Sequence, residues 1–93
     1  QPIGLWGQRH KQYLKEHRYI VYTTMLIDGT LNRYLADINQ QAEQMFHRLI
    51  DEMAQKQGVT EQLKAENQME WVQQMNACKA QAEEIVKFEL IYD

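Results

Sequence analysis

The chain contains very little cysteine and proline, with one residue of each among its 93. The single cysteine, Cys78, cannot form a disulfide within the chain, which excludes cysteine-rich secreted scaffolds and favours a reducing cytoplasm. No apolar run approaches the roughly twenty residues that a membrane-spanning helix requires, and no signal peptide is recognisable. We therefore expect a cytoplasmic protein without membrane association. Because the sequence begins with Gln-Pro rather than with Met, we also expect it to lack its natural N-terminal segment.

Signals for β-strands are absent as well. Residues that favour strands do not alternate with polar residues over any useful window, and the four glycines are few. Ala, Gln, Glu, Lys, Leu and Met dominate the chain, and all of them favour helices. Apolar residues make up 44% and charged residues 25%, as in an ordinary soluble domain. We predict a single all-α domain over residues 1–93, with no cofactor.

Glycine and threonine mark the expected helix ends in the first third of the chain. Residues 1–7 contain Pro2 and two glycines and are predicted to form a loop. A helical pattern follows from about Gln8 and is expected to break near 17–19, where aromatic and β-branched residues begin. Gly29 is typical of a residue that ends a helix, and Thr30 is a good cap for the next one.

Two long helices are predicted after this point, over Leu31–Gln57 and from Thr60 to Tyr92. Gly58 is expected to end the first, and the side chain of Thr60 to cap the second. The second contains no glycine or proline and would be about 45 Å long at 1.5 Å per residue. Apolar residues of the first recur at steps of three and four, which favours near-parallel helix packing; they are Leu31, Leu35, Ile38, Ala42, Met45, Leu49 and Met53.

These two helices are predicted to form a long antiparallel helical hairpin. A turn of about three residues at Gly58 would force them to run in opposite directions. The domain is then a small helical bundle built on this hairpin, with shorter N-terminal helices packed against it. Those helices are too short to cover the whole apolar surface. A second copy of the chain could cover the rest, so we expect a homodimer.

Residues with catalytic or metal-binding chemistry form no recognisable pattern. Zinc sites need three or four closely spaced ligands, and neither a cysteine pair nor a His-x-x-x-His motif is present. We predict no metal site, no catalytic residue and no enzyme activity. Glu66 and Glu70 are expected on a solvated face, and Cys78 as a small buried side chain. Solvated surface positions are likewise expected for the three histidines, His10, His17 and His47.

One charged segment suggests a ligand class. The net charge of −3 is unevenly distributed, because residues 1–18 hold four basic residues and only one acidic residue. This basic N-terminal group could contact nucleic-acid phosphates, although four positive charges give only weak, salt-dependent binding. A solvated helix face is the other interpretation, and it is the one that we favour. The group consists of Arg9, Lys11, Lys15 and Arg18.

One apolar segment suggests a protein partner. Met69, Trp71 and Met75 lie close together in the last predicted helix. Methionine-rich and tryptophan-rich segments can form adaptable binding surfaces, so these residues are candidates for a partner or dimer interface. The same pattern is also typical of a core, which is the interpretation that we favour. Polar neighbours such as Asn67 and Asn76 could fix helix register or could face water.

Five separated blocks of the sequence carry a family resemblance. They are Pro2-Ile3-Gly4 with Trp6-Gly7, the run from Tyr13 to Arg18, Gly58-Val59-Thr60, Gln68-Met69 with Trp71-Val72, and Glu83 to Val86 with Glu89 to Tyr92. On these blocks the chain resembles the transposon-encoded TnpV proteins over nearly its whole length. The resemblance implies a gene on a conjugative or mobilisable element, beside a recombinase. It implies no reaction and no functional residues.

Two hypotheses follow. In the first, the chain is a non-enzymatic accessory protein that dimerises through its helices and binds a recombinase or another protein of the element. In the second, it is a small DNA-binding accessory factor that works like an excisionase through the basic N-terminal group. An enzyme is the least supported class, because no catalytic signature is present.

Overall fold

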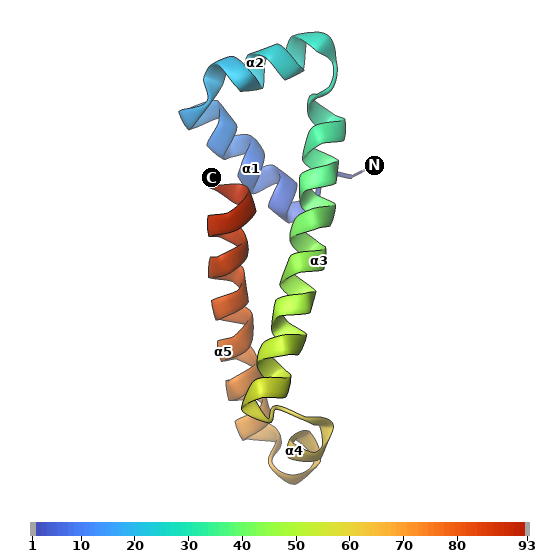
Figure 1. Cartoon of the computed structure of the whole chain (residues 1–93), viewed down its shortest axis with the longest axis vertical. Coiled ribbons are helices and arrows are strands. Elements are labelled where there is room, and N and C mark those ends of the chain that lie inside the picture. Colours follow the sequence, from blue (N-terminus) through green and yellow to red (C-terminus); the bar gives the residue numbers. More distant parts are fainter. Residues whose placement is uncertain (1, 93) are drawn as a thin grey trace.

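The computed structural model describes residues 2–92, and every regular element in this range is a helix. The prediction of an all-α protein is confirmed. In chain order the helices are α1 (Gly4–His17), α2 (Tyr19–Asp28), α3 (Leu31–Gln57), α4 (Glu61–Glu66), α5 (Gln68–Val86) and the π-helix η1 (Lys87–Ile91), shown in Figure 1. The molecule is a rod, with extents of 55 × 24 × 18 Å.

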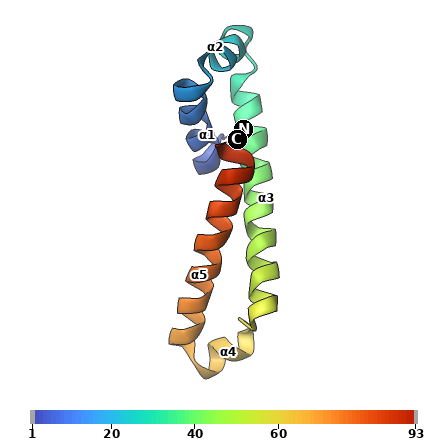
Figure 2. The ribbon, with the colours of Figure 1, turned by 60° about the vertical axis from the view of Figure 1, so that its left-hand side comes forward.

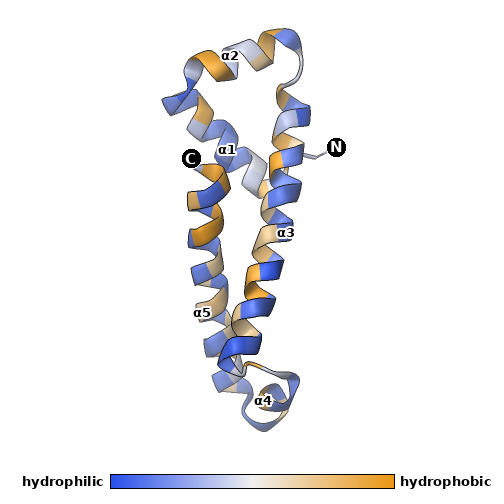
Figure 3. Cartoon of the chain, in the orientation of Figure 1, coloured by the Kyte–Doolittle hydropathy of each residue, from blue (hydrophilic) through white to orange (hydrophobic). Residues whose placement is uncertain are grey.

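The long axis of the rod is formed by α3 and α5, which lie side by side with opposite chain directions (Figures 1 and 2). The short helix α4 connects them at one end. At the other end α1 packs against α3 and η1, and α2 crosses the end of the rod between α1 and α3. Hydrophobic and hydrophilic residues alternate along α3 and α5, whereas hydrophobic residues make up much of α2 (Figure 3).

Most predicted helix ends are confirmed. The helical conformation is interrupted at Arg18, between α1 and α2. Gly29 and Gly58 end their helices in the left-handed conformation that glycine adopts readily. The Thr60 side chain caps α4 by accepting a hydrogen bond from the Leu63 amide. Thr30 does not cap α3; its amide and hydroxyl instead donate to the carboxylate of Asp28.

Two predicted boundaries are wrong. The first helix begins at Gly4 rather than near Gln8, because the predicted loop is part of α1. The single helix from Thr60 to Tyr92 is interrupted at Asn67, whose backbone leaves the helical region with φ −150° and ψ 86°. The Asn67 side chain then caps α5 by accepting from the Glu70 amide, as asparagine commonly does. The link between the long helices is therefore a helical turn, not a three-residue turn.

The core consists of three apolar clusters arranged along the rod. One joins α1, α3, α5 and η1, a second joins α1 to the start of α3, and the third joins the end of α3 to α5. The rod is only about two helices thick, so few side chains are enclosed completely. The fully buried members of the clusters with the largest side chains are Leu35, Ile91, Val86 and Cys78.

Candidate interaction surfaces

The position of α1 is fixed by a buried asparagine on α3. Asn39 is 9% exposed, and its Oδ1 accepts hydrogen bonds from the amides of Trp6 and Gly7 at 3.1 and 3.3 Å. The first amides of a helix have no partner within the helix, so α3 caps α1 through this side chain. Gly4 and Gly7 lie against α3, where Cβ atoms would meet Asn39 and the Leu35 carbonyl. Sequence analysis missed Asn39, although the spacing of these glycines signals close approach.

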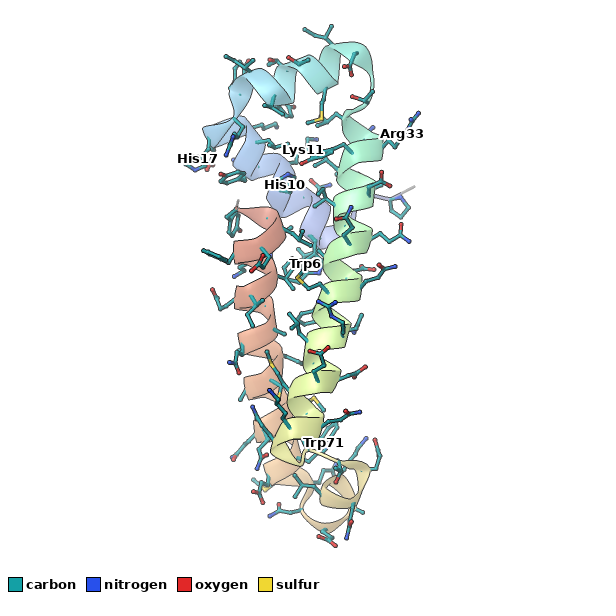
Figure 4. All side chains as sticks on the ribbon, viewed as in Figure 1. Trp6, His10, Lys11, His17, Arg33 and Trp71 are labelled. Atoms are coloured by element: carbon teal, nitrogen blue, oxygen red, sulfur yellow. The ribbon has the colours of Figure 1, made fainter. Side chains whose placement is uncertain are left out.

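His10 is buried, contrary to the prediction that it is a solvated surface residue. It is 4% exposed, with Nδ1 2.7 Å from the Ile91 carbonyl and Nε2 2.9 Å from the Tyr34 hydroxyl. The carbonyl can only accept, so Nδ1 donates to it, while the Tyr34 hydroxyl, which can both donate and accept, is the partner of Nε2. Burial raises the pKa of Tyr34, which keeps its hydroxyl protonated and able to donate. His10 therefore links α1, α3 and η1 (Figure 4).

No group of three or more His, Cys, Asp or Glu side chains within residues 2–92 could hold a metal ion. His17 and His47 are exposed, as predicted, and so are Glu66 and Glu70. Cys78 is 1% exposed, with its Sγ 3.6 Å from Gln57 Oε1. The interpretation of this cysteine as a small buried side chain is confirmed.

The four residues of the basic N-terminal group do not share one face. Arg9 Nη1 forms an ion pair with Glu83 Oε1 of α5 at 3.0 Å, and its guanidinium lies 5.0 Å from the Trp6 ring. Lys11 is two residues further along the helix, which places it on nearly the opposite side, in line with Lys15 one turn later. Figure 4 shows Lys11 between α1 and α3. Arg18 is exposed at the break between α1 and α2.

The segment around Trp71 is divided between the core and the surface. Trp71 and Met75 are half-buried against the cluster that contains Cys78, at the α4 end of the rod (Figure 4). The ammonium of Lys64 lies 4.6 Å from the centre of the Trp71 ring. Met69, in contrast, is 76% exposed and lies beside Val72 on the first turns of α5. Met69 is thus the member of this group that is free to contact a partner.

The most unusual surface belongs to α2. None of its ten residues is buried, although most of them are apolar. Its inner side, with Tyr22 and Met25, packs on the Leu14 cluster. The outer side supplies half of the large apolar side chains that the described residues expose; these are Tyr19, Ile20, Val21, Leu26 and Ile27. We call these five residues the α2 face. Several large apolar side chains exposed on one short helix are typical of an interaction site.

In a comparison with known protein families, residues 1–91 of the chain match the family described as transposon-encoded protein TnpV. The chain belongs to the TnpV family. The resemblance found from the five sequence blocks is therefore confirmed, and the gene is of the transposon-encoded type that the family description names. No curated protein and no solved structure matches the chain.

The TnpV family description gives an origin and no reaction. The function of this family member is therefore inferred from its surfaces. Among residues 2–92, no helix is both long and apolar enough to cross a membrane. The surfaces to be explained are the α2 face at one end of the rod and the patch around Met69 near the other.

Proposed function

We propose that this TnpV protein is a non-enzymatic accessory protein of a conjugative or mobilisable transposon, acting through protein–protein contacts as a helical homodimer. The observation that carries the proposal is α2, an apolar helix with no buried residue. Burial of apolar surface is the main driving force of association, at about 25 cal/mol per Å². The outer side of α2, unlike the inner side that packs on the Leu14 cluster, gains this stabilisation by contact with another protein.

The total surface of the chain supports a partner of ordinary size. The accessible area is 6490 Å² for a mass of 11.1 kDa. A typical folded monomer of this mass exposes about 5,700 Å². The excess of about 800 Å² is what one partner contributes to a standard protein–protein interface. A rod two helices thick thus exposes enough additional surface for one such interface.

The patch around Met69 is a second contact surface, and we assign it to the recombinase or another protein of the element. It lies near the end of the rod opposite to α2, so a dimer formed at α2 leaves it accessible. Its neighbours include Glu66 and Glu70, both exposed. A partner surface that combines apolar and basic residues would complement this end.

This assignment is tested by measuring binding of the protein to the purified recombinase of the same element. Replacing Met69 by glutamate should weaken that binding at least tenfold, about 1.4 kcal/mol, by placing a charge in the apolar contact. Asn76→Glu is the matched control, since it adds the same charge at another exposed position of α5, and it should bind like the wild type. No binding at tens of micromolar, or equal binding by both variants, would refute the assignment.

DNA binding is the alternative function, and one observation favours it. Within residues 2–92, Lys11, Lys15 and Arg18 form no ion pair with an acidic side chain, so their charges are available to phosphates. Replacing all three by glutamine should abolish binding to DNA of the element ends and flatten its salt dependence. Arg9→Gln is the control, because Arg9 is engaged by Glu83. Absence of binding at low salt would rule out this function.

A further inference from the structure

The α2 face suits a second copy of the same helix. We infer that α2 pairs with α2 of a second chain in antiparallel orientation about a two-fold axis, with Ile20 of each copy against Ile27 of the other. This inference rests on the proposed homodimer and specifies its interface. Two-fold interfaces use the same patch on both copies, so the patch must be complementary to itself.

The spacing of the apolar side chains meets this requirement. Ile20 and Ile27 are 81% and 85% exposed and lie seven residues apart, about two helical turns, on one side of α2. In an antiparallel pair centred between Thr23 and Thr24, Ile20 of each copy contacts Ile27 of the other copy. The interface would then contain two equivalent apolar contacts with small side chains between them, which permits close approach of the helices.

The two threonines can be covered without loss of hydrogen bonds. The Thr23 hydroxyl donates to the Tyr19 carbonyl at 2.9 Å, and the Thr24 hydroxyl donates to the Ile20 carbonyl at 2.8 Å. Burying a hydroxyl costs free energy only when it loses its partner, and both are satisfied within their own helix. The centre of the α2 face therefore behaves as an apolar surface.

Charge at the two ends of α2 favours the antiparallel orientation. Arg18 precedes the helix and Asp28 ends it, and both are exposed. An antiparallel pair brings the end that carries Arg18 beside the end of the second copy that carries Asp28, whereas a parallel pair would place like charges together. The helix dipoles add to this preference, because each positive end lies beside a negative end.

The position of α2 in the fold leaves space for a second copy. It crosses the end of the rod, away from α4 and α5 (Figure 1), and Ile20 and Ile27 are its most exposed large apolar side chains. The self-complementary spacing of Ile20 and Ile27 and the opposite charges of Arg18 and Asp28 make a second copy the occupant that the observations favour. If an unrelated protein covers this face instead, the purified chain should form no mixed disulfide between residues 20 and 27.

Cysteine cross-linking tests the pairing directly. Cys78 is the only cysteine and is buried, so Cys78→Ala provides a background without thiols. On it, Ile20→Cys chains mixed with Ile27→Cys chains of different tag length should form a mixed disulfide under mild oxidation. Ile27→Cys alone should not, since its two copies lie about 10 Å apart along the helix axis, beyond disulfide reach. Gln73→Cys, at an exposed position of α5, is the control for random collision.

Sedimentation of Ile27→Glu separates this inference from the proposed homodimer. Residue 27 is almost fully exposed, so the variant should keep the helical circular dichroism of the wild type while its dimer dissociates at least tenfold more readily. A variant that stays as dimeric as the wild type, with no mixed disulfide, overturns pairing through α2 and leaves a homodimer through another face. A monomeric wild type overturns both proposals.

Discussion

Replacing Asn39 by leucine should lower the free energy of unfolding by about 3 kcal/mol, since each buried donor that loses its partner costs about 1–3 kcal/mol. The Asn39 side chain accepts from the amides of Trp6 and Gly7 at the start of α1. Leucine has a similar volume and no acceptor, so both amides would be left without a partner between α1 and α3. Urea unfolding at one fixed protein concentration measures the change, because dimerisation makes stability depend on concentration.

Asn32→Leu is the matched control for this substitution. Asn32 lies on the same helix two turns earlier and is exposed. Surface substitutions of this kind usually change stability by less than about 0.5 kcal/mol. Equal stability of the two variants would contradict the assignment of Asn39 as the residue that caps α1. A loss confined to Asn39→Leu would support it.

Gly4→Ala should cost about as much, and for a related reason. Gly4 has φ +64°, and a Cβ added there would overlap the Asn39 amide. The left-handed conformation alone costs an alanine about 1–2 kcal/mol. The overlap adds the hydrogen bonds that Asn39 would lose, so we expect a total of about 3 kcal/mol. Thermal or urea unfolding would measure it.

Gly29→Ala measures the backbone contribution to this cost without the contribution of steric overlap. Gly29 also has a positive φ, of +80°, but no atom lies within 4 Å of a Cβ placed there. Its replacement should therefore cost only the left-handed backbone conformation, about 1–2 kcal/mol. The double variant of Gly4→Ala and Asn39→Leu should lose less unfolding free energy than the sum of the two single-variant losses, since both substitutions act on the same hydrogen bonds. Full additivity would show that the two residues act independently.

The helix ends could be predicted where a local signal determines them. Gly29, Gly58 and Thr60 act through their own backbone freedom or side-chain oxygen, which the sequence displays directly. The break at Asn67 could not be predicted in the same way. Asparagine is tolerated inside a helix as well as at its start. In this structure Asn67 starts α5, and Trp71 and Met75 of α5 then pack against the end of α3.

The buried polar residues could not be predicted, because their partners are distant in sequence. His10 meets Ile91, which is 81 residues away, and Asn39 meets Trp6 across 33 residues. Only the fold brings these groups together, and a lone histidine or asparagine in a helix carries no mark of burial. The two glycines that approach Asn39 were the one available signal, and we interpreted them as parts of a loop.

The α2 face shows the limit of periodicity as a guide to function. Ile20 and Ile27 lie seven residues apart in the sequence, a spacing that core residues of a helix also show. The break at Arg18 turns α2 across the end of the rod, so that Leu14 is buried while both isoleucines face outward. The sequence thus contains the apolar surface, and the direction of one short helix decides whether it belongs to the core or to a partner.

Sedimentation equilibrium of this chain at tens of micromolar tests the central claim most directly. A homodimer formed through α2 predicts a mass of twice 11.1 kDa for the wild type and a lower average mass for Ile27→Glu, whose dimer dissociates at least tenfold more readily. Salt should change the wild-type mass little, since the proposed contact is mainly apolar. A wild-type chain that sediments only as an 11.1 kDa monomer would contradict the claim.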